Sequence, residues 1–177
     1  MIEVDVEDPR HPDARSCIAQ YVAELDARFS GGFDPARSLP AADDELVLPA
    51  GLLLVARLHA RPVGCAALKL HGQQPAEVKR MWVARAARGL GLGRRLLDAI
   101  EDRARTVGVP ALRLETNRAL GEAIGLYRSA GYREVAASIP NPSPITGSRR
   151  TSHPPHPRTA RPEPHPRRRC RPAARRR

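Results

Sequence analysis

The chain has 177 residues, which is enough for one domain with a hydrophobic core. Its formal net charge is +11, but residues 141–177 hold eleven of the 30 Lys and Arg residues and one of the 19 Asp and Glu residues. The remainder is nearly neutral, so the basic character belongs to the tail and not to the domain. No stretch approaches the ~20 apolar residues of a membrane-spanning helix. The acidic N-terminus lacks the apolar run of a signal peptide.

The three cysteines lie far apart, and neither they nor the histidines have the spacing of a metal site. Cys65 lies in an apolar run, which favours a small buried residue. We therefore expect a reduced, cytoplasmic protein that needs no metal and does not associate with a membrane.

The N-terminal part of the chain predicts one strand and one helix. Apolar residues alternate with acidic ones over residues 2–6, as in a half-buried strand. Asp13 is a candidate N-cap for a helix over residues 14–28. An acidic connection that contains prolines follows over residues 34–50.

The middle of the chain predicts three strands and a helix. Apolar runs over residues 51–59 and 62–70 indicate a hairpin, and residues 76–83 indicate a third strand. After a glycine-rich loop, apolar residues at a spacing of three to four predict a helix over residues 92–107.

The remaining elements complete an α/β fold. A strand over residues 111–116, a helix over 119–130 and a strand that starts at 132–137 follow in order. Because a helix joins the 76–83 and 111–116 strands, they should be parallel neighbours with a right-handed crossover. We expect a mixed, mostly antiparallel sheet flanked by helices.

The loop between residues 76–83 and 92–107 reads RGLGLGR, with a glycine at every second position. A glycine loop that enters a helix exposes unpaired backbone N–H groups at the positive end of the helix dipole. It also approaches a ligand closely because glycine has no Cβ. The loop therefore predicts a phosphate site, with a ligand-free turn as the alternative. Its spacing fits neither the P-loop nor the Rossmann fingerprint.

The loop resembles the R/Q-x-x-G-x-G/A loop of the GNAT superfamily of acetyl-CoA-dependent N-acetyltransferases. The preceding AEVKRMWV resembles the fourth strand of these enzymes. The segment at residues 113–135 resembles their strand–helix–strand unit that ends in L-Y-x-x-x-G-F/Y. The resemblance covers about residues 1–137 and implies an enzyme. Such an enzyme transfers the acetyl group of acetyl-CoA to a primary amine of a small molecule or protein, by direct attack in a ternary complex.

The resemblance also implies how coenzyme A is held. Loop N–H groups would bind its pyrophosphate, with Leu90 and Leu92 facing inward. The two parallel strands would splay apart and leave backbone groups of residues 81–83 free for the pantetheine arm. The expected cofactor-binding residues are Met81, Trp82, Val83, Arg88, Gly89, Leu90, Gly91, Leu92, Gly93, Arg94 and Asn117.

Two residues are candidates for proton transfer. Tyr127 matches the family tyrosine that protonates the departing thiolate, with a core tyrosine as the alternative. Glu77 lies where some members carry a base, with an exposed strand carboxylate as the alternative. Asn117 would bind the cofactor or the acceptor, or cap the second helix. Many relatives have an asparagine seven residues before the tyrosine, where this chain has Leu120.

Residues 138–177 have no apolar period and predict a disordered tail, rich in proline and arginine, outside the domain at residues 1–137. No final strand is visible there, so the last strand of the sheet should be missing or irregular. The tail is either a GC-rich gene segment read out of frame or a basic arm that binds nucleic acid non-specifically.

The basic tail suggests an alternative function for the chain. In this alternative, the protein is a catalytically impaired acyl-CoA-binding protein whose basic arm binds nucleic acid or another acidic partner. The sequence leaves the formation of a homodimer open.

Overall fold

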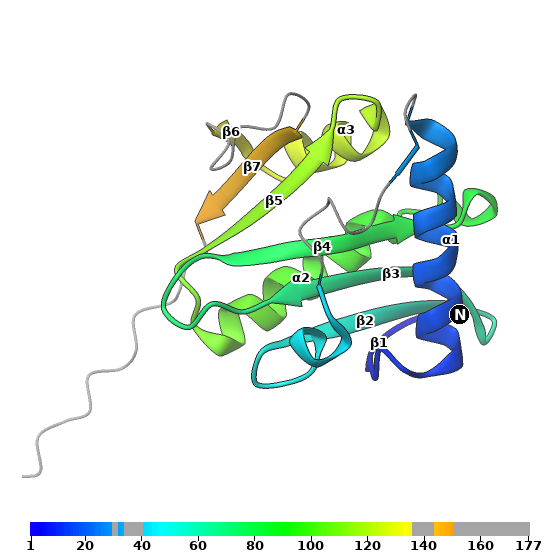
Figure 1. The fold of residues 1–177 in the computed structure, drawn as a ribbon, viewed down its shortest axis with the longest axis horizontal. Coiled ribbons are helices and arrows are strands. Elements are labelled where there is room, and N and C mark those ends of the chain that lie inside the picture. The colour runs from blue at the N-terminus through cyan, green and yellow to red at the C-terminus, as the bar shows by residue number, and fades with distance from the viewer. Residues whose placement is uncertain (30–31, 34–40, 136–143, 151–177) are drawn as a thin grey trace, which may run out of the picture.

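One sheet of seven strands organises the chain, in the order β1-β2-β3-β4-β5-β7-β6 (Figure 1). The computed structural model describes residues 1–29, 32–33, 41–135 and 144–150, the last range as backbone. Only β4 and β5 are parallel, and the other paired strands are antiparallel. The strands are β1 (Ile2–Glu7), β2 (Gly51–Leu58), β3 (Arg61–Lys69), β4 (Ala76–Val83), β5 (Ala111–Asn117), β6 (Arg133–Val135) and β7 (Pro144–Arg150). The predicted α/β class with a mixed, mostly antiparallel sheet is confirmed.

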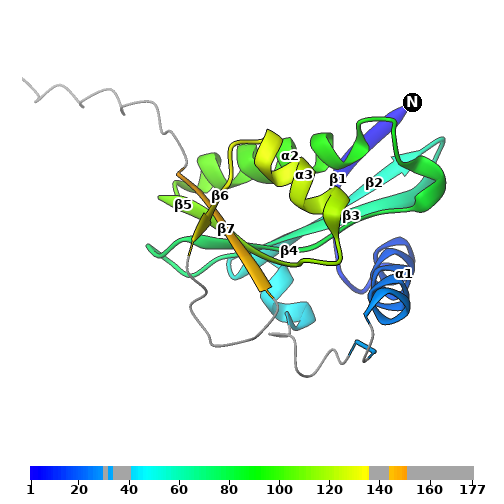
Figure 2. The ribbon, with the colours of Figure 1, turned by 90° about the horizontal axis from the view of Figure 1, so that it is seen from above.

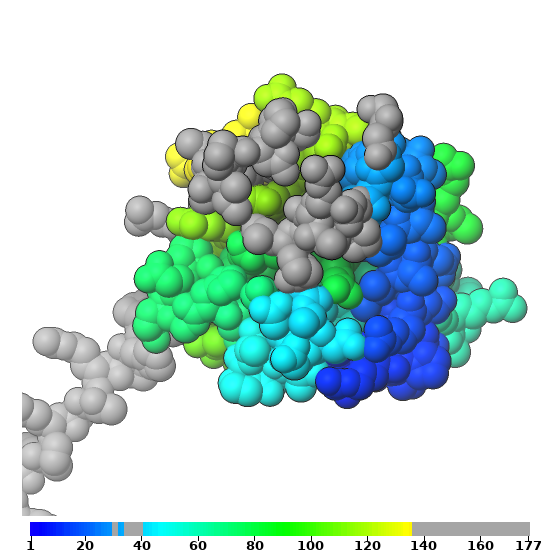
Figure 3. All heavy atoms as spheres, in the orientation of Figure 1, coloured from blue at the N-terminus to red at the C-terminus, as the bar shows by residue number. Residues whose placement is uncertain are grey.

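Helices cover both faces of this sheet. Figure 2 shows α2 (Leu92–Val107) and α3 (Gly121–Ser129) on one face, and α1 (Pro12–Arg28) on the other. The short 3-10 turn η1 (Asp43–Leu46) lies on the α1 face, and a second turn, η2 (Arg85–Ala87), leads from β4 toward α2. The space-filling view shows α1 and the η1 region on neighbouring parts of one face (Figure 3).

The central strands are apolar on both sides because both of their faces are covered. In β2, Leu52 and Leu54 join the cluster that packs against α2 and α3, which we call the α2-side core. Leu53 and Val55 join a second cluster with residues of α1, the α1-side core. All four side chains are buried, which explains why β2 reads as a continuous apolar run instead of an alternating one.

The N-terminus of α1 differs from the prediction. The N-cap is His11, whose Nδ1 accepts a hydrogen bond from the Asp13 N–H at 3.2 Å. Asp13 lies inside the first turn, and its carboxylate accepts a hydrogen bond from Arg57 Nε on β2 at 2.9 Å. The local sequence pattern placed Asp13 at the N-cap because it could not reveal that the side chain pairs with Arg57, which lies far along the chain.

The sheet also has a final strand where the sequence predicted that one would be missing or irregular. β7 pairs with β5 in unbroken register, from Ala111 opposite Arg150 to Asn117 opposite Pro144. β6 pairs with the other side of β7. Backbone hydrogen bonds build this ladder, so it needs no apolar alternation in β7 itself. The prediction for the rest of residues 138–177 lies outside the described residues.

Candidate acetyl-CoA site

The sheet opens between its two parallel strands. β4 and β5 pair only where Ala76–Val78 lies opposite Leu112–Leu114. Beyond this point β4 continues to Val83 and β5 to Asn117, and β5 stays paired with β7 instead. The two strands therefore diverge, as Figure 1 shows, and we call the V-shaped interval between their backbones the opening. The predicted splay of these strands is confirmed.

A bulge interrupts β4 just past its pairing with β5. Cys65 on β3 lies opposite Trp82 and Ala67 lies opposite Lys79, so β4 has one extra residue over this interval. Arg80 lies within the bulge and has a left-handed backbone with φ 51°. As a result, the β4 side chains after the bulge lie on the opposite face of the sheet from the one that a regular strand would give them. Val78 contributes to the α2-side core, whereas Trp82 contributes to the α1-side core.

The glycine loop is open on its outer side. Gly89 and Gly91 have φ 79° and 75°, and a Cβ built at either position would meet no atom within 4 Å. These glycines are therefore required by backbone conformation and not by crowding from the protein. Gly91 is the N-cap of α2, and the first hydrogen bond inside the helix runs from Arg95 N to Gly91 O at 3.1 Å. The N–H groups of residues 92–94 thus precede the helical ladder, as a phosphate cradle needs.

The third glycine has a different role. A Cβ at Gly93 would lie 3.3 Å from Leu126 Cδ2, so glycine at this position lets α2 pack closely against α3. Leu92 is 2% exposed, as expected for an inward-facing residue. Leu90 is 55% exposed, so the expectation that it also faces inward is wrong. It lies between two left-handed glycines, before the helix begins, and therefore projects from the tip of the loop.

Arg88 fixes the loop to its surroundings. Its Nε donates to the carbonyl oxygen of Val83 at 3.0 Å, and its Nη2 donates to both carboxylate oxygens of Glu24 on α1 at 2.6–2.7 Å. Glu24 also accepts a hydrogen bond from the Trp82 indole at 2.9 Å. Burial alone would raise the pKa of Glu24, but the hydrogen bonds from Arg88 and Trp82 outweigh it and lower that pKa. Arg88 therefore holds the start of the loop to β4 and α1.

Glu24 begins an ionic chain that reaches α3. Arg28 Nε lies 3.2 Å from Glu24, and both terminal nitrogens of Arg28 donate to Glu122 at 3.1 Å. These hydrogen bonds lower the pKa of Glu122 to about 2. The Arg28–Glu122 pair therefore links α1 to α3, which cover opposite faces of the sheet. Sequence analysis missed Glu24, whose only local signal is its helical i,i+4 spacing to Arg28.

Tyr127 lies on α3 and is 7% exposed. Its ring centroid is 5.8 Å from that of Tyr132. Burial, with a smaller effect from Tyr21 on α1, raises the pKa of Tyr127 well above its usual range. The hydroxyl therefore stays protonated at neutral pH, which is the state that a proton donor needs.

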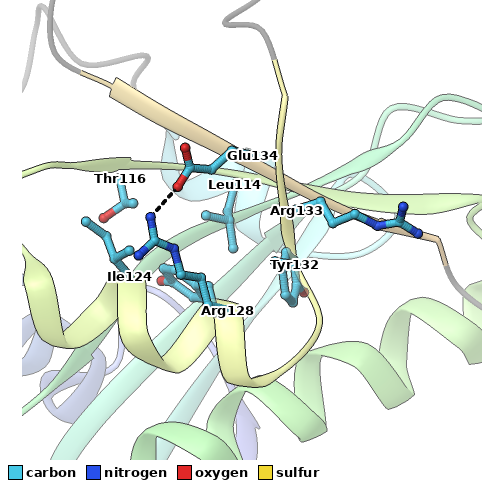
Figure 4. A pocket seen from close by; sticks show the side chains of 8 residues that line it. Leu114, Thr116, Ile124, Arg128, Tyr132, Arg133 and Glu134 are labelled. Carbon is cyan, nitrogen blue, oxygen red and sulfur yellow. Dashed lines mark hydrogen bonds and ion pairs between the residues drawn. The ribbon is translucent and has the colours of Figure 1, made fainter.

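A small, mainly apolar cavity lies beside Tyr127, between α3, β5 and β6 (Figure 4). Arg128 and Glu134 form an ion pair at 2.6 Å between α3 and β6. The cavity belongs to the packing of α3 on the sheet and not to the glycine loop, because β5, α3 and β6 supply its walls. The lining residues are Leu114, Thr116, Ile124, Tyr127, Arg128, Tyr132, Arg133 and Glu134.

The two remaining candidates lie at opposite ends of the opening. Glu77 is at the closed end, and its carboxylate lies 3.3 Å from Lys79 Nζ and 3.5 Å from His71 Nε2. Asn117 is at the open end, where its Oδ1 accepts a hydrogen bond from Ala119 N at 2.9 Å. Asn117 shapes the turn before α3 and does not cap the helix, because the N-cap is Leu120.

Two negative findings apply to the part of the chain that the structure describes. Within these residues, no group of three or more His, Cys, Asp or Glu side chains is arranged to hold a metal ion. Among the described helices, none is long and apolar enough to cross a membrane.

Comparison with known proteins agrees with this architecture. A protein of Azospirillum brasilense named IAA acetyltransferase is 39% identical over 140 residues, which are 77% of this chain and 91% of that protein. The N-alpha-acetyltransferase RimI of Mycobacterium tuberculosis is 39% identical over 121 residues, covering 66% of this chain and 73% of RimI. A GNAT family acetyltransferase from Elizabethkingia anophelis, solved with acetyl-CoA bound, shares the fold at a TM-score of 0.62 and 19% identity. That match covers 84% of this chain and 97% of the solved one.

The match to the family model includes both the glycine loop and Tyr127. It extends over residues 19–132, from α1 through the glycine loop to the end of α3. This range includes the bulged β4, the open loop and Tyr127, which the resemblance had singled out. The chain is therefore an acetyltransferase that belongs to the acetyltransferase (GNAT) family.

Proposed function

We propose that the protein transfers the acetyl group of acetyl-CoA to a primary amine of a small molecule or protein, by direct attack in a ternary complex. The observation that supports this proposal is the V-shaped opening between β4 and β5, with the open glycine loop following the unpaired end of β4. A thioester that lies in the opening can be approached from the α1 face by an amine. The enzyme then needs no covalent intermediate.

The glycine loop would hold the pyrophosphate. The N–H groups at the start of α2 precede the helical ladder, and Gly89 and Gly91 leave the space in front of them free of side chains. The positive end of the helix dipole adds to the attraction for phosphate. Arg94 pairs with Asp98 at 2.8 Å, so backbone groups make the larger contribution to this site.

The β4 bulge would supply a donor for the thioester carbonyl. The Arg80 carbonyl accepts a hydrogen bond from Cys65 Sγ on β3 at 3.2 Å. In a planar trans peptide, the N–H of the next residue points in the opposite direction to this carbonyl. The Met81 N–H therefore points away from β3, toward the opening. A donor at this position stabilises the oxyanion that forms when an amine attacks the carbonyl carbon.

Two side chains would complete the proton transfers. The amine nitrogen forms its bond to the carbonyl carbon and loses a proton, which Glu77 accepts through water. The carbon–sulfur bond then breaks, and Tyr127 donates its hydroxyl proton to the departing thiolate. Glu77 is suited to exchange protons with water because its side chain is 29% exposed.

An acetyl-transfer assay with a panel of amines tests this function. We expect free coenzyme A to appear only when both acetyl-CoA and a suitable amine are present. Glu77→Gln should lower kcat by about 10²-fold, because it removes the base, while the KM for acetyl-CoA stays unchanged. The discriminating measurement is the pH–rate profile. If Glu77→Gln keeps the kcat of the wild type across the whole profile, Glu77 is not the base.

A further inference from the structure

We propose that Cys65 is a positioning residue, whose thiol sets the direction of the Met81 N–H and so orients the donor for the acetyl carbonyl. This inference rests on the proposed function, because it concerns the same oxyanion donor. Cys65 itself lies on β3 and acts through the Arg80 carbonyl, with which its Sγ makes a 3.2 Å hydrogen bond.

The bulge makes such a contact necessary. In a regular antiparallel ladder, the carbonyl and N–H groups of β4 would pair with the backbone of β3. Here Ala66 alone lies opposite two β4 residues, Arg80 and Met81, so the register cannot provide each of them with a backbone partner. The Cys65 thiol takes the place of a backbone donor for the Arg80 carbonyl. Because the carbonyl and the next N–H belong to one rigid plane, holding the first also fixes the second.

Arg80 has a conformation that depends on external support. Its φ of 51° is unfavourable for a residue with a long side chain. Two contacts oppose relaxation of this backbone. The Cys65 thiol binds the Arg80 carbonyl, and the Arg80 guanidinium donates to the carbonyl oxygen of Ala41 near η1.

The Cys65 thiol is suited to be a hydrogen-bond donor because it stays protonated. Its side chain has no solvent exposure, and its neighbour Cys17 directs its own thiol to the Gly64 carbonyl at 3.5 Å. The contact with Cys17, together with burial, raises the pKa of Cys65 well above its usual range. The Cys65 sulfur therefore keeps its proton at neutral pH, and the Arg80 carbonyl oxygen lies within its reach.

A matched set of variants separates this role from simple packing. Cys65→Ser replaces the thiol by a smaller hydroxyl and keeps a donor, whereas Cys65→Ala removes the γ atom and the donor together. Cys17→Ala removes a thiol from the same buried cluster, but that thiol binds Gly64 and not the bulge. Loss of packing should therefore lower the melting temperature in all three variants. The Met81 N–H should lose its orientation in Cys65→Ala alone.

Selective labelling with ¹⁵N-methionine reports the donor directly. The chain has two methionines, and the nitrogen of Met1 is the terminal amine, so the spectrum of the full chain contains one methionine amide signal, that of Met81. We expect acetyl-CoA to shift this signal to lower field in the wild type, in Cys65→Ser and in Cys17→Ala. Coenzyme A, which lacks the acetyl carbonyl, should produce a smaller shift. In Cys65→Ala the response to acetyl-CoA should fall to that of coenzyme A.

Kinetics give the second readout. Cys65→Ala should lower kcat by about tenfold, a part of the 10²-fold to 10³-fold cost of losing an oxyanion donor completely. Cys65→Ser should restore kcat, and the KM for acetyl-CoA should stay unchanged in both variants. Equal responses of the Met81 signal in Cys65→Ala and in the wild type would overturn the inference. A wild-type protein that binds no acetyl-CoA would instead overturn the proposed function, and the inference with it.

Discussion

Replacing Tyr127 with phenylalanine is expected to lower kcat by about 10²-fold to 10³-fold, with the KM for acetyl-CoA unchanged. The ring that packs against Tyr132 is kept, so the core of the domain should retain its shape. Only the hydroxyl is lost, and with it the proton that we propose Tyr127 donates to the departing thiolate. Steady-state kinetics measured at a saturating concentration of amine provide the test.

Tyr132→Phe is the matched control, because Tyr132 belongs to the same buried cluster and forms the other half of the aromatic contact. We expect its kcat to remain close to that of the wild type. An equal loss in both variants would show that the hydroxyl of Tyr127 acts through packing.

The pH dependence of kcat gives a second check on Tyr127. Because burial raises the pKa of Tyr127, its hydroxyl should remain protonated beyond the usual tyrosine value of about 10. Deprotonation of Tyr127 should therefore cause no loss of kcat below that pH. If the wild type shows an alkaline decline there and Tyr127→Phe lacks it, the assigned pKa direction is wrong.

Gly91→Glu is expected to weaken the binding of acetyl-CoA by about 10²-fold or more, equivalent to about 2.7 kcal/mol. The new side chain would enter the open space in front of the loop, where it places a carboxylate against the incoming phosphates. It would also occupy a left-handed backbone with φ 75°, which costs stability at a residue other than glycine. The fluorescence of Trp82, the only tryptophan in the chain, can follow the titration.

Gly108→Glu controls for strain and charge. Gly108 is the C-cap of the same helix, has φ 83°, and likewise has no atom within 4 Å of a Cβ. This variant should lose at least as much stability as Gly91→Glu, because a carboxylate at a helix C-terminus opposes the dipole. It should nevertheless bind acetyl-CoA normally. A similar loss of affinity in both variants would mean that the loop is not the phosphate site.

The parts of the fold with a strong local pattern could be predicted from the sequence. The predicted range of α2, residues 92–107, matches the structure because apolar residues recur at helical spacing between Gly91 and Gly108. The range of β4 also matches, and its sequence carried the family resemblance together with the glycine loop and residues 113–135. Local sequence was sufficient because both elements are bounded by turns.

The parts that depend on distant partners could not be predicted. Arg88 was expected among the cofactor-binding residues, and its contact with Glu24, which lies 64 residues earlier in the chain, could not be predicted from the local pattern. Asn117 was expected to bind the cofactor or to cap the second helix, but α3 begins later and the Asn117 Oδ1 stabilises the preceding turn. β7 has little apolar pattern of its own, and its pairing with β5 became visible only in the sheet.

The most direct test of the central claim is the initial rate of acetyl transfer, measured while the concentrations of acetyl-CoA and of an amine acceptor are varied together. Direct attack in a ternary complex at the opening between β4 and β5 predicts double-reciprocal lines that intersect. It also predicts that incubation with acetyl-CoA alone leaves the protein unmodified. Parallel lines, together with an acetylated protein in the absence of amine, would contradict the account.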